Sequence, residues 1–285
     1  MSNNSHVIAE NISYEYSNFK LQNINFEIEK GEIIGFVGKN GSGKTTTIKC
    51  ITGQLEFKTG SVQIEDVFLK DHPERYKDRV GYVCEDTNIY EELTPIQFSN
   101  IFGKFYTKWD NNKYLHLIEI FELDKKKKIS QFSKGMKMKF HLAFALSHGA
   151  DFLVLDEPTS GLDPFIRDEF LNILANESKN NIAILFSTHI TEDILKIADK
   201  IIFISDGEIK FYLPALKIEE SCFRLPKEKV AILSNENYEI IEEFIDEYII
   251  WIDIQKEKQF ELTGNEKPLS FNELLGMYNN KWSNI

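Results

Sequence analysis

The stretch from Gly38 to Thr45 constrains this chain more than any other feature of its sequence. It reads Gly-Lys-Asn-Gly-Ser-Gly-Lys-Thr, which fits the P-loop pattern of a glycine, four free residues and then Gly-Lys-Thr. An apolar run, residues 33–37, precedes it, and a segment that can be helical, residues 45–52, follows it. A strand, a glycine-rich loop and a helix in this order are the context in which the pattern binds phosphate.

The glycines of this loop let successive backbone N–H groups converge on one concave site, and the start of the helix adds its own free amides. We therefore predict that the phosphates of a nucleotide contact Gly38, Asn40, Gly41, Ser42, Gly43 and Thr46. Lys44 is expected to neutralise the β- and γ-phosphates, and the Thr45 hydroxyl to ligate Mg²⁺. The alternative is a glycine-rich turn that only connects a strand to a helix.

The composition excludes several classes of protein. Of the 285 residues, 42% are hydrophobic and 27% charged, as in an ordinary globular protein, and the net charge of −12 argues against nucleic acid as a partner. No apolar run approaches the ~18 residues of a membrane span, and the polar first six residues do not form a signal peptide. Cys50, Cys84 and Cys222 are few and scattered, which fits a reducing cytosol and neither a disulfide framework nor a zinc site.

The pattern along the chain predicts an α/β domain. Apolar residues in 7–16 and 21–28 predict an antiparallel meander with Tyr16 at the tip of its first hairpin, and a further strand is expected over 61–69. Continuous apolar runs at 152–155, 182–186 and 201–204 alternate with segments of helical spacing. Such an alternation is typical of a mainly parallel sheet.

The pattern breaks up after about residue 213. Short segments at 222–225, 230–233 and 248–254 have strand character, and 238–247 has helical character. The sequence Ser-Phe-Asn-Glu at 270–273 is a capping box that opens a last helix. We therefore predict a small C-terminal α+β appendage without a chemical motif.

Three polar residues follow predicted buried strands of the α/β domain. Asp156 and Glu157 come after the run at 152–155, and His189 comes after the run at 182–186. Ligands of an open parallel sheet bind beyond the carboxyl ends of its strands, so these residues could meet the P-loop in one site. Asp156 is then the expected Mg²⁺ ligand, Glu157 the base that activates water, and His189 a hydrogen-bond donor to the γ-phosphate. For His189, the alternative is a structural histidine.

At this point the sequence resembles the nucleotide-binding subunits of ABC transporters, over roughly residues 6–212. The P-loop matches Walker A, 152–157 matches Walker B with its catalytic glutamate, 160–163 looks like the D-loop, and His189 looks like the switch histidine. The resemblance implies an ATPase that uses ATP and Mg²⁺. It also implies a P-loop NTPase core with an antiparallel β subdomain and a helical subdomain at about 86–150. Residues 1–212 would form the ATPase domain and residues 213–285 an accessory domain.

The resemblance also gives meaning to residues outside the Walker motifs. Tyr16 aligns with the aromatic residue that stacks on adenine, although a half-buried strand tyrosine is the alternative on its own pattern. Ser133-Lys134-Gly135-Met136 stands where the family signature reads Ser-Gly-Gly-Gln, so Ser133 and Gly135 are expected to contact ATP. Glu85 stands at a position normally held by glutamine, and we expect a carboxylate there to be coupled to the metal. Both variants look similar to those of bacterial exporters of drugs or of antimicrobial or amphipathic peptides.

The partners are implied by the same resemblance. Family members form head-to-tail dimers in which each ATP lies between the P-loop of one chain and the signature of the other. Both halves occur in this chain, so a homodimer is expected, and a heterodimer with a degenerate partner is the alternative. A separate transmembrane permease subunit is expected to hold this chain at the cytoplasmic face of the membrane, and the groove that receives it would include residues 85–92. Two alternatives remain: a soluble ABC ATPase acting on ribosomes or DNA, which the acidity disfavours, and a module that binds ATP without cleaving it, which Glu157 disfavours.

Overall fold

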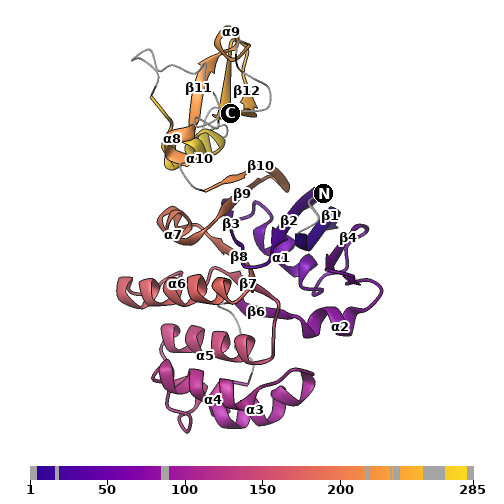
Figure 1. Cartoon of the computed structure of the whole chain (residues 1–285), viewed down its shortest axis with the longest axis vertical. Coiled ribbons are helices and arrows are strands. Elements are labelled where there is room, and N and C mark those ends of the chain that lie inside the picture. The colour runs from indigo at the N-terminus through magenta and orange to yellow at the C-terminus, as the bar shows by residue number, and fades with distance from the viewer. Residues whose placement is uncertain are drawn as a thin grey trace.

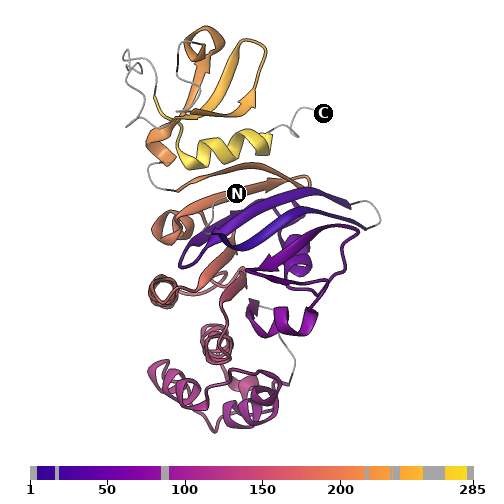
Figure 2. The ribbon, with the colours of Figure 1, turned by 45° about the vertical axis from the view of Figure 1, so that its right-hand side comes forward.

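The computed structural model describes residues 5–16, 19–84, 90–215, 218–231, 233, 238–252 and 267–280. Within them the strands form three sheets, with the orders β2-β1-β4-β5, β10-β9-β3-β8-β7-β6 and β11-β13-β12. Figures 1 and 2 show the helical region at one end of the molecule, the two larger sheets in the middle and the C-terminal sheet at the other end.

The central sheet is parallel apart from its last strand, as the sequence predicts. Its strands are β3 (Ile33–Val37), β6 (Val80–Cys84), β7 (Phe152–Asp156), β8 (Ala183–Thr188), β9 (Lys200–Ser205) and the antiparallel β10 (Glu208–Pro214). Strands β3, β7 and β8 are buried at every position, because both faces of the sheet are covered. One face packs on α1 (Lys44–Ile51) and the antiparallel sheet, and the other on α5 (Lys134–Ser147), α6 (Pro164–Lys179) and α7 (Thr191–Ile197).

The antiparallel sheet lies against the central sheet and contains β1 (Ser5–Tyr16), β2 (Phe19–Glu29), β4 (Thr59–Ile64) and β5 (Val67–Phe68). A short helix, α2 (Pro73–Asp78), follows it. The single strand expected over 61–69 is wrong in one respect. Glu65 has φ 54° and starts a turn, so that Val67 folds back to pair with Ile64.

The helical region is built from α3 (Pro95–Phe102), η1 (Gly103–Phe105), α4 (Asn111–Ile120), η2 (Ile129–Gln131) and α5. Local signals set its boundaries. Thr94 and Gln97 form a reciprocal capping box at the start of α3, and the Asp110 carboxylate accepts the amides of Asn112 and Lys113 at the start of α4.

The C-terminal region contains α8 (Ile218–Ser221), β11 (Cys222–Pro226), α9 (Lys227–Val230), β12 (Tyr238–Glu243), β13 (Glu247–Ile252) and α10 (Phe271–Asn280). The helix expected at 238–247 is wrong, because β12 pairs with β13. The strand expected over 230–233 is wrong as well, since Val230 ends α9. The capping box is confirmed: the Ser270 hydroxyl accepts the Glu273 amide at 3.2 Å, and the Glu273 carboxylate accepts the Ser270 amide at 2.8 Å.

The C-terminal region continues the core of the central sheet. Strand β10 pairs with β9 as far as Pro214, and Figures 1 and 2 show α10 beside β10. Phe271 and Leu274 of α10 are buried in the same hydrophobic cluster as Phe203 and Phe211. In the parts of the chain that the structure describes, no helix combines the length and the apolar character of a membrane span.

Candidate active site

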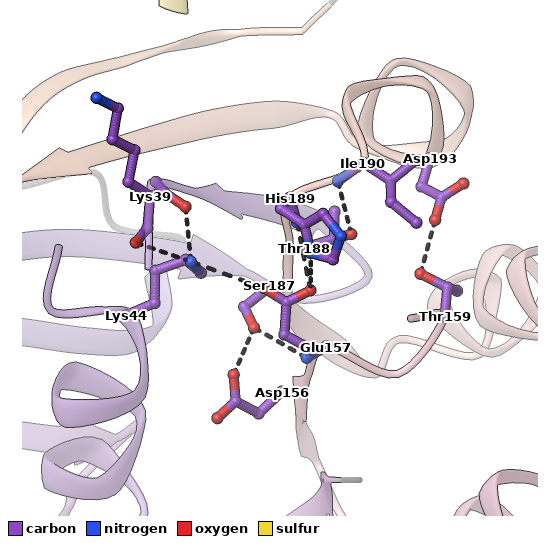
Figure 3. Close-up of polar contacts among 11 residues, drawn as sticks. Lys39, Lys44, Asp156, Glu157, Thr159, Ser187, Thr188, His189, Ile190 and Asp193 are labelled. Atoms are coloured by element: carbon purple, nitrogen blue, oxygen red, sulfur yellow. Dashed lines mark hydrogen bonds and ion pairs between the residues drawn. The ribbon is translucent and has the colours of Figure 1, made fainter. Parts of the chain in front are cut away.

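The P-loop has the backbone conformation that phosphate binding needs. Gly41 and Gly43 have φ angles of 81° and 114°, in a region that favours glycine. A Cβ added to Gly41 would meet no atom within 4 Å, and Gly41 lines an open pocket. The Lys44 ammonium donates hydrogen bonds to the carbonyl oxygens of Gly38, at 2.6 Å, and Lys39, at 3.2 Å (Figure 3). These two hydrogen bonds therefore hold the Lys44 ammonium against the backbone of the P-loop.

The side chain of Ser42 is a further indication that a ligand binds at this loop. Its hydroxyl oxygen is buried and has no hydrogen-bond partner among the described residues. A buried polar group without a partner costs about 1–3 kcal/mol. The open face at Gly41 and this hydroxyl both fit phosphate oxygens.

Glu157 stands at the centre of the polar contacts in Figure 3. One carboxylate oxygen lies 3.6 Å from the Lys44 Nζ, and the other lies 2.7 Å from His189 Nδ1 and accepts the His189 amide at 3.3 Å. The Glu157 backbone has φ 51°, an uncommon conformation for a residue with a side chain. The predicted cation, base and histidine therefore form one connected group.

Asp156 is buried at the end of β7, and its Oδ1 accepts a hydrogen bond of 2.7 Å from the Ser187 hydroxyl. The Thr45 hydroxyl belongs to an exposed residue in the first turn of α1. A carboxylate and a hydroxyl supply the hard oxygen ligands that Mg²⁺ prefers. The donor set of Asp156 and Thr45 thus fits the predicted ion.

A pocket of about 590 Å³ opens over the P-loop. Its lining includes Lys39, Asn40, Gly41, Gly43, Lys44, Thr45, Thr46, Lys49, Leu55 and Glu157. Tyr14, Tyr16 and Phe19 complete this lining, and Tyr16 is 67% exposed. The exposed ring of Tyr16 is free of the half-buried strand packing that was its alternative. The pocket joins an aromatic wall to a phosphate loop.

The signature residues lie outside the lining of this pocket. Ser133 caps α5 by accepting the Met136 amide at 3.3 Å, and Gly135 lies in the first turn of that helix. A Cβ on Gly135 would lie 3.0 Å from Ile166 of α6, so the first turn of α5 packs closely on α6. Glu85, the predicted metal-coupled residue, is outside the described residues.

Two residues that sequence reasoning did not single out take part in the site. The Ser187 hydroxyl contacts Asp156 and also accepts the Glu157 amide at 3.1 Å. The Phe19 ring lies 3.0 Å from the position of a Cβ on Gly43 and lines the pocket. The place of Ser187 at the end of a buried run, directly before Thr188 and His189, was the available signal.

A P-loop on a parallel sheet, with an acidic pair and a histidine at the ends of neighbouring strands, defines a P-loop nucleoside triphosphatase. A family profile described as "ABC transporter" matches residues 21–160. The ATP-binding protein NatA of Bacillus subtilis is 33% identical over 66% of this chain and 79% of its own length. The chain therefore belongs to the ATP-binding subunits of ABC transporters, which are ATPases.

Other known proteins agree with this assignment. The bacitracin transport ATP-binding protein BcrA of Bacillus licheniformis is 33% identical over 68% of this chain and 64% of that protein. A solved ATP-binding subunit of an ABC transporter is 28% identical with a TM-score of 0.69, over 76% of this chain and 92% of that one. A dimeric cassette bound to ADP and Pi matches in fold, with 22% identity and a TM-score of 0.66 over 73% of this chain and 98% of that chain.

Proposed function

We propose that this chain hydrolyses ATP with Glu157 as the general base and that the hydrolysis drives export through a separate transmembrane subunit. The observation that carries the catalytic part is the contact of Glu157 with both Lys44 and His189. A base between the phosphate-binding cation and a hydrogen-bond donor can take a proton from water as the water attacks the γ-phosphate. Lys44 then neutralises the phosphates, and His189 orients the base and contacts the γ-phosphate.

The rest of the proposed site binds the nucleotide. The P-loop glycines, together with Asn40, Ser42 and Thr46, contact the phosphates, and the exposed Tyr16 ring stacks on adenine. Thr45 and Asp156 hold Mg²⁺, with Glu85 coupled to the ion. When bound, the ion neutralises charge that develops on the phosphate oxygens.

The substitution Glu157→Gln tests the role of the base. It keeps the size of the side chain and removes its ability to accept a proton. We expect turnover to fall by about 10²–10⁴-fold, with ATP binding retained and the ATP-bound dimer stabilised. Glu74→Gln, at an exposed residue of α2, is the control. Wild-type turnover by Glu157→Gln would show that another residue is the base.

We further propose that two copies of the chain enclose ATP, each with its P-loop facing the Ser133 and Gly135 of the other. Ser133 is exposed at the start of α5, and the free amides of a helix start attract phosphate. This supports a contact with the nucleotide of a second subunit, because Ser133 does not line the pocket of its own. Sedimentation of Glu157→Gln with ATP tests this: a monomer at saturating ATP contradicts it.

An aromatic surface on the helical region supports the membrane partner. We call it the aromatic stripe; it consists of Tyr90, Phe98, Phe102 and Phe105, with Ile101 beside them. Ring centroids are 4.8 Å apart for Tyr90 and Phe102 and 6.4 Å apart for Phe102 and Phe105. Phe105 is 77% exposed and Tyr90 56% exposed. Exposed apolar groups that gather in one place mark interaction sites, and Tyr90 of the stripe belongs to the predicted groove at residues 85–92.

Substitution in the aromatic stripe tests the docking of the transmembrane subunit. Phe105→Ser should abolish co-purification with that subunit and leave ATP binding unchanged. Ile245→Ser is the matched control, because Ile245 is 91% exposed but belongs to the turn between β12 and β13. Equal effects of both variants would contradict docking at the stripe. If this chain instead formed a stable complex with ribosomes, with DNA or with soluble proteins alone, the export function would be contradicted.

We propose drugs or antimicrobial peptides as the exported substrates, with the chain at the cytoplasmic face of the membrane. The bacitracin transport relative supports this class, as do Lys134 and Glu85 at their variant positions. Residues 1–212 would serve as the ATPase domain and 213–285 as an accessory domain. Stimulation of ATP hydrolysis by such compounds in vesicles that contain the transmembrane subunit tests the substrate class.

A further inference from the structure

Helix α7 carries a buried acid that the proposed mechanism does not use. Asp193 is only 1% exposed and lies four residues after His189. Its Oδ2 accepts a hydrogen bond of 2.7 Å from the Thr159 hydroxyl, and its Oδ1 lies 2.5 Å from Nε of Arg167. Removing a carboxylate from water costs several kcal/mol unless it is paired and hydrogen-bonded. Asp193 therefore holds in place the elements that supply its partners, because the loss of a partner would leave its charge buried and uncompensated.

The partners of Asp193 come from the segment that follows Glu157. Thr159 is two residues beyond Glu157 and fully buried, and Arg167 lies in the second turn of α6. Strands β7 and β8 are neighbours, with Asp156 opposite Ser187. The contact of Thr159 with Asp193 therefore joins the two chain segments that continue beyond Glu157 and His189 (Figure 3).

A second polar contact between these two parts of the chain lies before Glu157 and His189. The Ser187 hydroxyl bonds to Asp156 and to the Glu157 amide. Along the chain, Glu157 and His189 thus lie between a polar contact that joins β7 to β8 and a polar contact that joins the segments after these strands. His189 itself has little packing to hold it, because its side chain is 58% exposed.

Helix α7 needs such an anchor. It has seven residues, and a helix of that length is not stable without tertiary contacts. Its N-cap residue, Ile190, provides no side-chain hydrogen bond. The buried contacts of Asp193 therefore fix where α7 starts and with it the backbone of His189.

We propose that Asp193 is a positioning residue for ATP hydrolysis: through Thr159 and Arg167 it holds the backbone that presents His189 to Glu157. This inference rests on the proposed roles of Glu157 and His189. The alternative is an anchor that contributes to stability alone. The two differ in kinetics, because a lost positioning contact lowers kcat more than it weakens substrate binding.

The first test is Asp193→Asn in the full chain. We expect kcat to fall about tenfold or more, with KM and the affinity for a fluorescent ATP analogue within about twofold of the wild type. Asp168→Asn is the matched control. Asp168 also pairs α6 with α7, at 2.7 Å from Lys196, but the pair lies at the surface with side chains 61% and 42% exposed. That control should keep the wild-type kcat.

Thr159 provides a second, independent test that avoids changing a buried charge. Thr159→Val has nearly the same shape but no hydroxyl, and it should lower kcat in the same direction. Thr159→Ser keeps the hydroxyl and should retain most of the activity. The double variant that combines Thr159→Val with Asp193→Asn should have a kcat no lower than that of Asp193→Asn alone, because both changes break the same contact.

Two results would overturn the inference. One is a wild-type kcat in folded Asp193→Asn or Thr159→Val. The other is a loss of kcat that Thr159→Ser shares equally with Thr159→Val, since that loss does not depend on the hydroxyl. Glu157→Gln, assayed in parallel, separates the inference from the function on which it rests. If that variant keeps its turnover, the proposed base is wrong; if it loses turnover while the Thr159 variants behave alike, only the role of Asp193 is wrong.

Discussion

The carboxyl edge of the central sheet and the C-terminal region stabilise themselves in opposite ways. At the sheet edge, buried polar groups contact one another: Ser187 with Asp156, and Thr159 with Asp193. In the C-terminal region, apolar side chains form the core, and described ion pairs such as Arg224 with Glu247 are partly exposed. Exposed pairs contribute about 0–1 kcal/mol. Substitutions at the edge should therefore change chemistry, and those in the C-terminal region should change stability.

The largest expected effect is at the sheet edge, for Lys44→Ala. Without this cation the phosphates lose their main compensating charge, so we expect turnover to fall on the order of 10³-fold and ATP affinity to fall with it. ATPase assays and nucleotide titrations measure both. Thermal unfolding without nucleotide should change little. Lys58→Ala, at a side chain 72% exposed, is the control, and ATP binding at wild-type strength by Lys44→Ala would break the comparison.

The opposite behaviour is expected in the C-terminal region for Phe271→Ala. This side chain is 1% exposed and packs in the cluster shared with the central sheet. Its truncation should lower the free energy of unfolding by about 3–5 kcal/mol, as urea unfolding can measure. Assayed at low temperature, the folded variant should keep its kcat. Ile240→Ala, at a residue 49% exposed, should cost far less, and a large fall in kcat for Phe271→Ala with normal stability would reverse the assignment.

His148 at the end of α5 lies outside both regions and tests, through pH, how a buried titratable group affects stability. Burial lowers the pKa of this imidazole to about 4, from about 6.5 in the unfolded chain. Because the folded state binds the proton more weakly, the stabilisation is complete above about pH 6.5 and is lost as the pH falls toward about 4. The loss amounts to roughly 2–3 kcal/mol. Unfolding of His148→Gln should depend less on pH in this range; an unchanged dependence would contradict the prediction.

The smallest effect is expected for Tyr16→Ala, which should weaken ATP affinity about tenfold and leave kcat nearly unchanged. The ring lines the pocket away from the reacting phosphate. Isothermal titration and steady-state kinetics separate the two quantities. Tyr90→Ala, at an exposed tyrosine outside the pocket, is the control. A loss of kcat in place of affinity would mean that Tyr16 affects the chemistry.

Much of the fold could be predicted because its signals are local. The apolar runs at 152–155 and 182–186 became buried parallel strands, and the capping box at 270–273 opened the last helix. The prediction of secondary structure failed where the same apolar residues fit both the helical and the strand periodicity. Residues 238–243 read as a helix, yet pairing with β13 made them a strand. Such pairing depends on contacts that a local pattern does not contain.

The candidate site divides in the same way. The sequence by itself determined the P-loop, because its glycines, lysine and threonine act within one short segment. It also determined the residue types at the ends of the strands that follow. The tertiary structure decided which of them meet: β8 lies between β3 and β7 in the sheet, so that Lys44, His189 and Glu157 gather at one edge. It also created the contacts of Ser187 and Asp193, since strand order is set by long-range packing energy and each of these contacts joins segments far apart along the chain.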